Sequence, residues 1–212
     1  MNKENKDPKE FSCCVNPNKK VLDLSYWDMQ WQNQKTGWDI GYAAPAIKTY
    51  MEQYQDKNAA ILIPGCGNAY EAEFLLDSGF TNITLLDIAP SAVEKMKEKF
   101  AHAPQIQILC GDFFQHEGQY DLIIEQTFFC ALDPVNRSSY VDKMHSLLSE
   151  NGKIIGLLFD TVFEAEGPPF GGKVEEYRTL FEEKFKIRNL DACYNSITPR
   201  NGKEVFINFN KK

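Results

Sequence analysis

Residues 60–87 read AILIPGCGNAYEAEFLLDSGFTNITLLD, and this stretch decides the fold of the chain. The continuous apolar run at 61–63 is typical of a parallel strand covered on both faces. Gly65 and Gly67 then allow a sharp turn and the close approach of a ligand to the backbone. A helical pattern over 69–78 ends at Gly79, and a second apolar strand over 83–86 leads into Asp87. The stretch predicts a strand–helix–strand unit.

Asp87 follows the second strand, at the edge where such a unit binds its ligand. A carboxylate in this position can accept hydrogen bonds from both hydroxyls of a ribose. Dinucleotide-binding folds prefer a third glycine at the position that Tyr70 occupies here, and Glu71 and Glu73 would repel a pyrophosphate at the helix N-terminus. S-adenosylmethionine carries a sulfonium and no phosphate. The stretch therefore predicts nucleoside binding and favours that cofactor; the alternative is a structural turn followed by a solvated aspartate.

Composition indicates one soluble α/β domain. The chain has 212 residues, of which 43% are hydrophobic and 25% charged, and its net charge is −7. With no basic run longer than the pairs at 19–20 and 211–212, nucleic acid is not an expected partner. No stretch is apolar over the ~18 residues needed to span a membrane, and the N-terminus has no apolar leader, so a cytoplasmic monomer is expected.

Cysteine and histidine patterns do not predict a metal site. The six cysteines include no C-x-x-C pair and the three histidines are scattered, so we expect reduced, mostly buried thiols.

The N-terminal part of the chain has two distinct segments. Residues 1–20 are polar and aperiodic, so we expect a disordered tail, followed by a single domain over 21–212 whose first part, 21–55, forms a lid and a helix. All three tryptophans, Trp27, Trp31 and Trp38, fall within twelve positions, and the first two share one face if this piece is helical. The rings form either a satellite hydrophobic cluster or an aromatic lid whose faces attract a sulfonium.

After Asp87 the alternation of helices and strands continues. Ser91 and Glu94 have the spacing of a helix-capping box. A third strand over 106–109 is followed by Asp112 and Phe113, which suit the exocyclic amine and the face of an adenine; the alternative is a turn before a core phenylalanine. A fourth strand over 120–124 leads to residues 125–126 at the same edge.

The second half of the chain predicts a helix over 136–148, a turn at 151–152, a strand over 154–159 and a helix over 174–185. The Gly- and Pro-rich loop between the last two, at 160–173, is placed to wall a substrate pocket. Strands over 186–192 and 203–209 would close the sheet as an antiparallel pair. The expected architecture is an α/β fold: a seven-stranded, mostly parallel sheet with helices on both faces.

Five motifs in order make the chain similar to a known family. It resembles the thiopurine methyltransferase family, especially the halide/thiol methyltransferase branch, over roughly residues 25–205. The motifs are YWDMQWQNQKTGWDIG (26–41), IPGCG (63–67), FFCALDP (128–134), EGPPF (166–170) and TPRNGKE (198–204). The resemblance implies a Rossmann-like class I methyltransferase fold and an S-adenosylmethionine cofactor.

The resemblance also implies which residues bind the cofactor. The implied set is Trp27, Trp31 and Trp38 from the lid, Gly65 at the methionine portion, Asp87 at the ribose, Asp112 and Phe113 at the adenine, and Gln126. Gln126 departs from the family pattern, since relatives carry Tyr or Arg there.

The implied reaction is methyl transfer to a small sulfur nucleophile, either a thiol or a thiopurine-like compound, or to a halide. A thiolate or halide needs no proton removed, so we expect no dedicated general base and assign no catalytic residue. Cys130 lies in an apolar context that raises a thiol pKa, and we interpret it as a packing residue. The alternatives are a nicotinamide-dependent oxidoreductase and a non-catalytic module that binds the cofactor without turnover.

Overall fold

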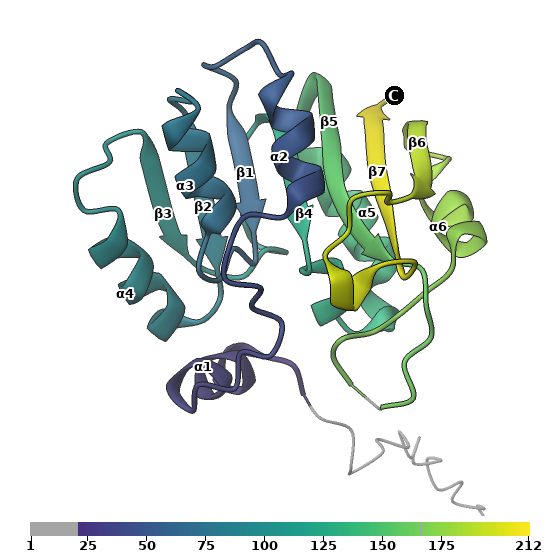
Figure 1. The fold of residues 1–212 in the computed structure, drawn as a ribbon, viewed down its shortest axis with the longest axis horizontal. Helices are drawn as coiled ribbons and strands as arrows, with labels where there is room; N and C mark the ends of the chain where they lie inside the picture. The colour runs from purple at the N-terminus through teal and green to yellow at the C-terminus, as the bar shows by residue number, and fades with distance from the viewer. Residues whose placement is uncertain (1–20, 166) are drawn as a thin grey trace, which may run out of the picture.

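A seven-stranded sheet runs through the middle of the molecule (Figure 1). The computed structural model describes residues 21–165 and 167–212, so the expected tail at 1–20 lies outside the described residues. The strand order is β3-β2-β1-β4-β5-β7-β6. The strands are β1 (Ile61–Pro64), β2 (Ile83–Asp87), β3 (Ile106–Cys110), β4 (Tyr120–Gln126), β5 (Leu148–Phe159), β6 (Phe185–Ala192) and β7 (Glu204–Lys211).

Strand direction follows the expected pattern. The pairs among β1 to β5 are all parallel, whereas β7 pairs antiparallel with both β5 and β6. The carboxyl ends of the five parallel strands therefore share one edge of the sheet. The predicted seven-stranded, mostly parallel sheet is confirmed.

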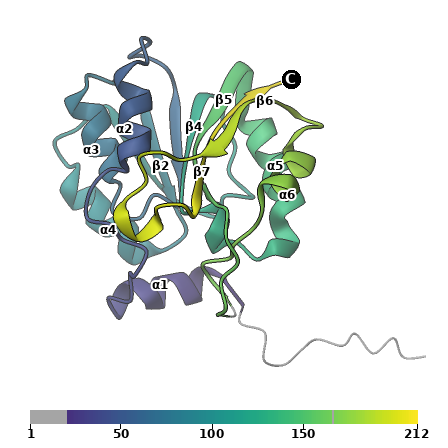
Figure 2. The same ribbon diagram turned by 45° about the vertical axis from the view of Figure 1, so that its right-hand side comes forward.

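Helices cover both faces of the sheet, as predicted. Figures 1 and 2 show α2, α3 and α4 on one face and α5 and α6 on the other, with α1 lying apart, across the end of the sheet. The α-helices are α1 (Leu24–Gln32), α2 (Pro45–Glu52), α3 (Tyr70–Asp77), α4 (Pro90–Lys99), α5 (Arg137–Leu147) and α6 (Val174–Phe181). Short 3-10 helices are η1 (Phe129–Ala131), η2 (Pro134–Asn136) and η3 (Thr198–Arg200). No helix in the described part of the chain is long and apolar enough to cross a membrane.

Two hydrophobic cores explain why β1 is apolar at every position. Successive side chains of a strand point to opposite faces of the sheet. Ile61 and Ile63 pack in the core with Leu75 of α3, whereas Leu62 packs in the other core with Tyr140 of α5. A strand that is buried on both faces favours apolar side chains at successive positions.

The predicted capping box of α4 is wrong. The helix begins at Pro90, and no side chain of its own cap bonds its N-terminus. Asp28 of α1 instead accepts a hydrogen bond from the backbone N–H of Ser91 at 2.7 Å, and Glu94 forms an ion pair one turn further along the helix. An aspartate from a distant segment thus supplies the acceptor that the sequence pattern assigned to Ser91.

The ends of the other helices and strands differ less from the predicted ones. The turn predicted at 151–152 lies inside β5, whose pairing with β4 shifts register between Tyr120 and Leu122, so the strand bulges and continues. The last helix, α6, ends at Phe181, and β6 begins at Phe185. Gly79 follows α3 with φ +84°, as a C-terminal cap requires.

Candidate functional site

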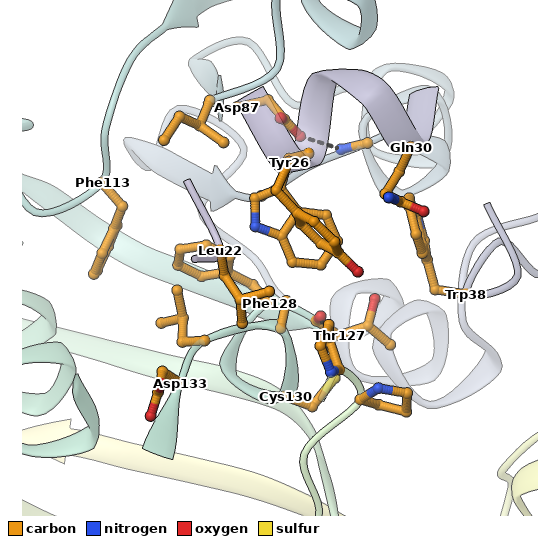
Figure 3. A pocket seen from close by; sticks show the side chains of 18 of the residues that line it. Leu22, Tyr26, Gln30, Trp38, Asp87, Phe113, Thr127, Phe128, Cys130 and Asp133 are labelled. Carbon is orange, nitrogen blue, oxygen red and sulfur yellow. Dashed lines mark hydrogen bonds between the residues drawn. The ribbon is translucent and has the colours of Figure 1, made fainter. Parts of the chain in front are cut away.

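A cavity of about 1210 Å³ opens at the carboxyl edge of the parallel strands. Its walls come from the ends of β1 to β5, from α1 and the segment after it, and from the η1, η2 and η3 regions. Figure 3 shows Asp87, Phe113 and Phe128 around the same space as Tyr26 and Trp38 of the N-terminal segment. This is the edge where open α/β sheets bind ligands.

The turn after β1 needs its two glycines. Gly65 and Gly67 have φ of +58° and +53°, a conformation that side chains with a Cβ rarely adopt. A Cβ on Gly65 would lie 2.3 Å from Cδ2 of Phe128, whereas one on Gly67 would lie 3.4 Å from the Trp31 ring. The absence of a side chain at Gly65 therefore lets the Phe128 ring close against the backbone that lines the cavity.

Asp87 lies at the end of β2 and is 8% exposed. Its Oδ2 accepts a hydrogen bond from the N–H of Gly67 at 3.0 Å, and its Oδ1 accepts one from the N–H of Ala89 at 2.9 Å. Burial raises the pKa of this carboxyl, although the backbone donors at Ala89 and Gly67 oppose the shift. Each oxygen keeps a further lone pair, which is the acceptor capacity that a ribose diol needs.

Asp112 and Phe113 line the cavity beyond β3. Asp112 is exposed, and its Oδ1 accepts a hydrogen bond from the N–H of Phe114 at 2.9 Å. Phe113 is buried, and its ring meets the Phe128 ring edge-on with 5.1 Å between centroids. Phe113 is thus a core residue and also part of the cavity wall, and its contact with an adenine stays a prediction.

The three tryptophans form one aromatic cluster that also lines the cavity. Ring centroids of Trp27 and Trp38 lie 5.6 Å apart, and those of Trp31 and Trp38 lie 6.0 Å apart. Trp31 is buried against Ala89 and Ala92. The rings thus pack together as a satellite cluster and also line the cavity, and their role as a lid over the cofactor stays a prediction.

Polar contacts tie the lid segment to the sheet domain at both of its ends. Asp28 bonds to the N-terminus of α4, as described above. Asp39 accepts hydrogen bonds from the Asn68 amide at 2.5 Å and from the Tyr70 hydroxyl at 3.3 Å. Arg200 donates to the carbonyl oxygen of Trp38 at 2.9 Å. The segment from α1 to Asp39 is thus docked onto the N-terminal ends of α3 and α4 and onto η3.

Gln126 does not line the cavity, unlike the other seven residues that the family resemblance implies. Its Oε1 is buried and has no hydrogen-bond partner among the residues that the structure describes. The next residue, Thr127, lines the cavity instead and has φ +58°. The backbone turns at Thr127, so this part of the cavity wall begins at Thr127 and continues with Phe128, whereas Gln126 lies outside the wall.

Three cations line the cavity, and the sequence did not indicate a role for any of them. They are Lys35, in the segment after α1, and Arg200 and Lys203, in and after η3. The Arg200 side chain is only 12% exposed, and its guanidinium lies 3.4 Å from Glu204 Oε1 and 5.5 Å from the centroid of the Phe159 ring. Both η3 cations belong to the TPRNGKE motif, but no pattern in that motif shows that it reaches the strand ends.

Cys130 is buried in η1 and also lines the cavity. Burial raises the pKa of its thiol, and the Glu125 carboxylate acts in the same direction. The thiol is therefore neutral at physiological pH, in keeping with its interpretation as a packing residue. Among residues 21–165 and 167–212, no group of three or more His, Cys, Asp or Glu could hold a metal ion.

Solved structures share this fold. A 1,6-didemethyltoxoflavin-N1-methyltransferase from Burkholderia thailandensis, solved with S-adenosylhomocysteine, superposes with a TM-score of 0.69 at 14% identity, covering 89% of this chain and 87% of that chain. The magnesium protoporphyrin IX methyltransferase of Synechocystis superposes with a TM-score of 0.65 at 15% identity, covering 92% and 90%. The chain therefore has the fold of the class I methyltransferases.

Sequence relatives identify the family. The model of the family described as Thiopurine S-methyltransferase (TPMT) matches residues 22–211. A probable thiol methyltransferase 2 of Arabidopsis thaliana is 33% identical over 84% of this chain and 81% of its own length. A thiopurine S-methyltransferase of Acinetobacter baylyi is 30% identical over 80% of this chain and 88% of its own length. The chain belongs to the thiopurine S-methyltransferase family and is an S-adenosylmethionine-dependent methyltransferase; a nicotinamide-dependent oxidoreductase is not favoured.

Proposed function

We propose that this methyltransferase acts on a small anionic acceptor, either a sulfur nucleophile such as a thiolate or thiopurine-like compound, or a halide. The names of its relatives support this class, since they include a thiol methyltransferase, thiocyanate methyltransferases and thiopurine S-methyltransferases. Within the cavity, the observation that carries the proposal is the largely buried side chain of Arg200 beside Lys203. Arg200 shares its charge with Glu204 at 3.4 Å, so Lys203 and Lys35 supply the net positive charge beside it, and a cation at a partly apolar wall attracts an anion more strongly than one in water.

The chemistry needs placement and a dry site. When bound, the cofactor would supply the methyl group of its sulfonium, which an anionic nucleophile would attack in line at carbon while S-adenosylhomocysteine leaves. The positive charge of the sulfonium and the negative charge of the acceptor are both lost during the transfer, so a poorly hydrated cavity favours the reaction. The chain contributes an aromatic lid over one side of the cavity and phenylalanine and proline side chains on the other. Alignment of the two reactants accounts for up to ~7–11 kcal/mol of barrier lowering when the geometry is well held.

The residues of the cavity fit the cofactor. We propose that the Asp87 carboxylate accepts hydrogen bonds from the ribose, that Asp112 and Phe113 contact the adenine, and that the backbone at Gly65 lies along the methionine portion. The ring faces of the lid tryptophans would attract the sulfonium. The open lone pairs of Asp87 and the position of Gly65 in the cavity wall support this arrangement. For Gln126, which lies behind the wall, we propose no direct contact.

The acceptor proposal is tested by removing the charge of Arg200. We expect Arg200→Met to raise the KM for thiocyanate by at least about tenfold, because the anion loses a buried cationic partner, and to weaken S-adenosylhomocysteine binding by a clearly smaller factor, because the Trp38 carbonyl also loses a hydrogen-bond donor. Lys186→Met, which removes an exposed cation on β6, is the matched control and leaves both unchanged. An unaltered thiocyanate KM in a folded Arg200→Met protein contradicts the anionic-acceptor proposal.

We also propose that the enzyme works as a cytoplasmic, single-domain monomer on small molecules and does not bind nucleic acid. The net charge of −7 disfavours a polyanionic partner. The free cysteines Cys66, Cys110, Cys130 and Cys193 suit a reducing compartment. Size-exclusion chromatography with light scattering tests the oligomeric state, and a dimer mass would contradict it.

A further inference from the structure

Glu125 is a buried carboxylate that the reaction itself does not use. It lies one residue before the end of β4 and is 0% exposed. Its Oε1 accepts hydrogen bonds from the backbone N–H groups of Phe128 at 2.8 Å and Phe129 at 2.9 Å. Its Oε2 accepts a hydrogen bond from the Tyr140 hydroxyl of α5 at 2.6 Å. Burying a carboxylate without an ion-pair partner is unfavourable, so three directed hydrogen bonds at one site suggest a role in placing the groups that donate them.

Phe128, the first of the two residues whose N–H groups bond to Glu125, lies on the proposed cofactor side of the cavity. Phe128 follows Thr127, a non-glycine residue with φ +58°, and such a conformation persists only where the surroundings hold it. Its ring lies against Gly65 and meets Phe113 edge-on. The bond from the Phe128 N–H to Glu125 therefore determines where this wall of the cavity stands.

The same loop continues to the acceptor side. The carbonyl oxygen of Cys130 accepts a hydrogen bond from the N–H of Phe170 at 2.7 Å. Phe170 follows Pro169, which lines the cavity, and the carbonyl of the next residue, Gly171, accepts a hydrogen bond from Arg137 at 2.6 Å. The wall formed after β5 is thus attached to the loop that Glu125 holds.

We propose that Glu125 is a positioning residue for methyl transfer, which fixes the 127–131 loop and with it the separation of the cofactor wall from the acceptor wall. This inference rests on the proposed placement of cofactor and acceptor in the cavity. In-line transfer requires the reacting atoms to lie about 3–3.5 Å apart, and a displacement of about 1 Å costs roughly 10²-fold in rate. One buried carboxylate that holds both walls is therefore sufficient to control the rate without touching either reactant.

Among the titratable groups that face each other here, Glu125 is the one whose charge changes near neutral pH. Tyr140 approaches from α5 and Cys130 from η1, while β5 presents the backbone of Gly156. Burial raises the pKa of Glu125 to about 7 and raises the pKa of both Tyr140 and Cys130, which stay neutral. The ionised carboxylate forms the stronger hydrogen bonds to the loop amides.

The test compares Glu125→Gln, which keeps an acceptor for both amides, with Glu125→Ala, which removes it. Thiocyanate serves as acceptor because its own charge does not change near neutral pH. We expect Glu125→Ala to lower kcat by about 10²-fold with less than about a fivefold rise in the thiocyanate KM, and to weaken S-adenosylhomocysteine binding about tenfold in calorimetry. Glu125→Gln restores kcat to within about fivefold of the wild type.

The pH profile separates positioning from general stability. Wild-type kcat should rise by up to about fivefold from pH 6 to pH 8 with a midpoint near 7, and Glu125→Gln should be flat. If Glu125→Ala does not fold, the comparison of the kcat–pH profiles of the wild type and Glu125→Gln tests the positioning role by itself. Asp121 at the other end of β4 is the control, because it accepts a backbone N–H from Ala60 at 2.9 Å and the Ser149 hydroxyl at 2.8 Å. Asp121→Ala should lower stability and leave kcat within about twofold.

Wild-type kinetics and binding in Glu125→Ala, or equal losses in Glu125→Ala and Glu125→Gln with an unchanged pH profile, overturn the positioning role. Absence of turnover by the wild type on every acceptor is a different result: it contradicts the proposed function, and the affinity for S-adenosylhomocysteine in the variants still tests Glu125.

Discussion

Replacement of Gly65 by alanine should damage both the fold and the cofactor site, and the chain supplies a control for the backbone part of the effect. Gly65 and Gly79 both have positive φ, at +58° and +84°. A Cβ on Gly79 would meet no atom within 4 Å, whereas a Cβ on Gly65 would lie 2.3 Å from the Phe128 ring. The two alanine variants therefore share a conformational penalty but differ in the clash.

The magnitudes follow from these two contributions. The left-handed conformation costs an alanine about 1–2 kcal/mol, which is the whole effect expected for Gly79→Ala. The clash adds about 1–3 kcal/mol for Gly65→Ala, as measured for overpacked cores, which gives about 2–5 kcal/mol in total. For a domain of this size we expect Tm to fall by about 2–8 °C in the control and by roughly 4–20 °C in Gly65→Ala.

Thermal unfolding followed by circular dichroism measures the first effect, and calorimetry with S-adenosylhomocysteine measures the second. Displacement of Phe128 into the cavity should weaken binding by at least about tenfold in Gly65→Ala and leave it unchanged in Gly79→Ala. The double variant Gly65→Ala/Phe128→Ala should lose less stability than the sum of the single variants, because the clash is gone. Equal effects of Gly65→Ala and Gly79→Ala on both readouts would refute the reasoning.

Other substitutions test the remaining parts of the site. Asp87→Ala should weaken S-adenosylhomocysteine binding at least tenfold, ~1.4 kcal/mol, by loss of the ribose acceptors; unchanged calorimetry in a folded variant would remove Asp87 from the site. Trp31→Ala should weaken the same binding by a similar factor, because the lid loses its buried ring, and tryptophan fluorescence would report the opened cluster. The backbone hydrogen bond from Ser91 lowers the pKa of Asp28, so the docking of α1 should be fully present above the ordinary pKa of an aspartate and be lost as pH falls below it. Protease sensitivity of the α1 segment, measured against pH, tests this, and the pH dependence should be absent in Asp28→Asn. Burial raises the pKa of Glu125 from 4.5 to about 7, so the native state binds this proton more tightly than the unfolded chain. Stability from this group is therefore full below pH 4.5, falls as pH rises from 4.5 to about 7 and is level above that. Urea unfolding of Glu125→Gln should lack up to about 3 kcal/mol of that decline, and an identical pH dependence would contradict it.

The fold was predictable because its signals are local. Strands β1, β4 and β5 each contain a short continuous apolar run, and the turn after β1 shows its two glycines directly. Asp87 could be assigned to the binding edge from the strand that precedes it, since the carboxyl ends of parallel strands share one edge. The same argument placed Asp112 and Phe113 at the cavity.

The parts that were not predictable depend on contacts between distant segments. The bond from Arg200 to the Trp38 carbonyl joins residues 162 positions apart, and the bond from Asp28 to Ser91 spans 63 positions. Periodicity in a single helix or strand contains no information about such pairs. Gln126 illustrates a different difficulty: the left-handed turn at Thr127 changes the direction of the chain at the strand end, so the cavity wall begins one residue later than the motif suggests.

The most direct test of the central claim is a methyl-transfer assay of the purified full chain with S-adenosylmethionine and thiocyanate, with iodide and a panel of thiols run in parallel. Mass spectrometry identifies the methylated product and measures S-adenosylhomocysteine formed in equal amount. We expect turnover on at least one of these anionic acceptors and a large loss of it in Arg200→Met. Tight binding of S-adenosylhomocysteine with no methylation of thiocyanate, iodide or any thiol would contradict the account of this site as a methyltransferase for small anionic acceptors.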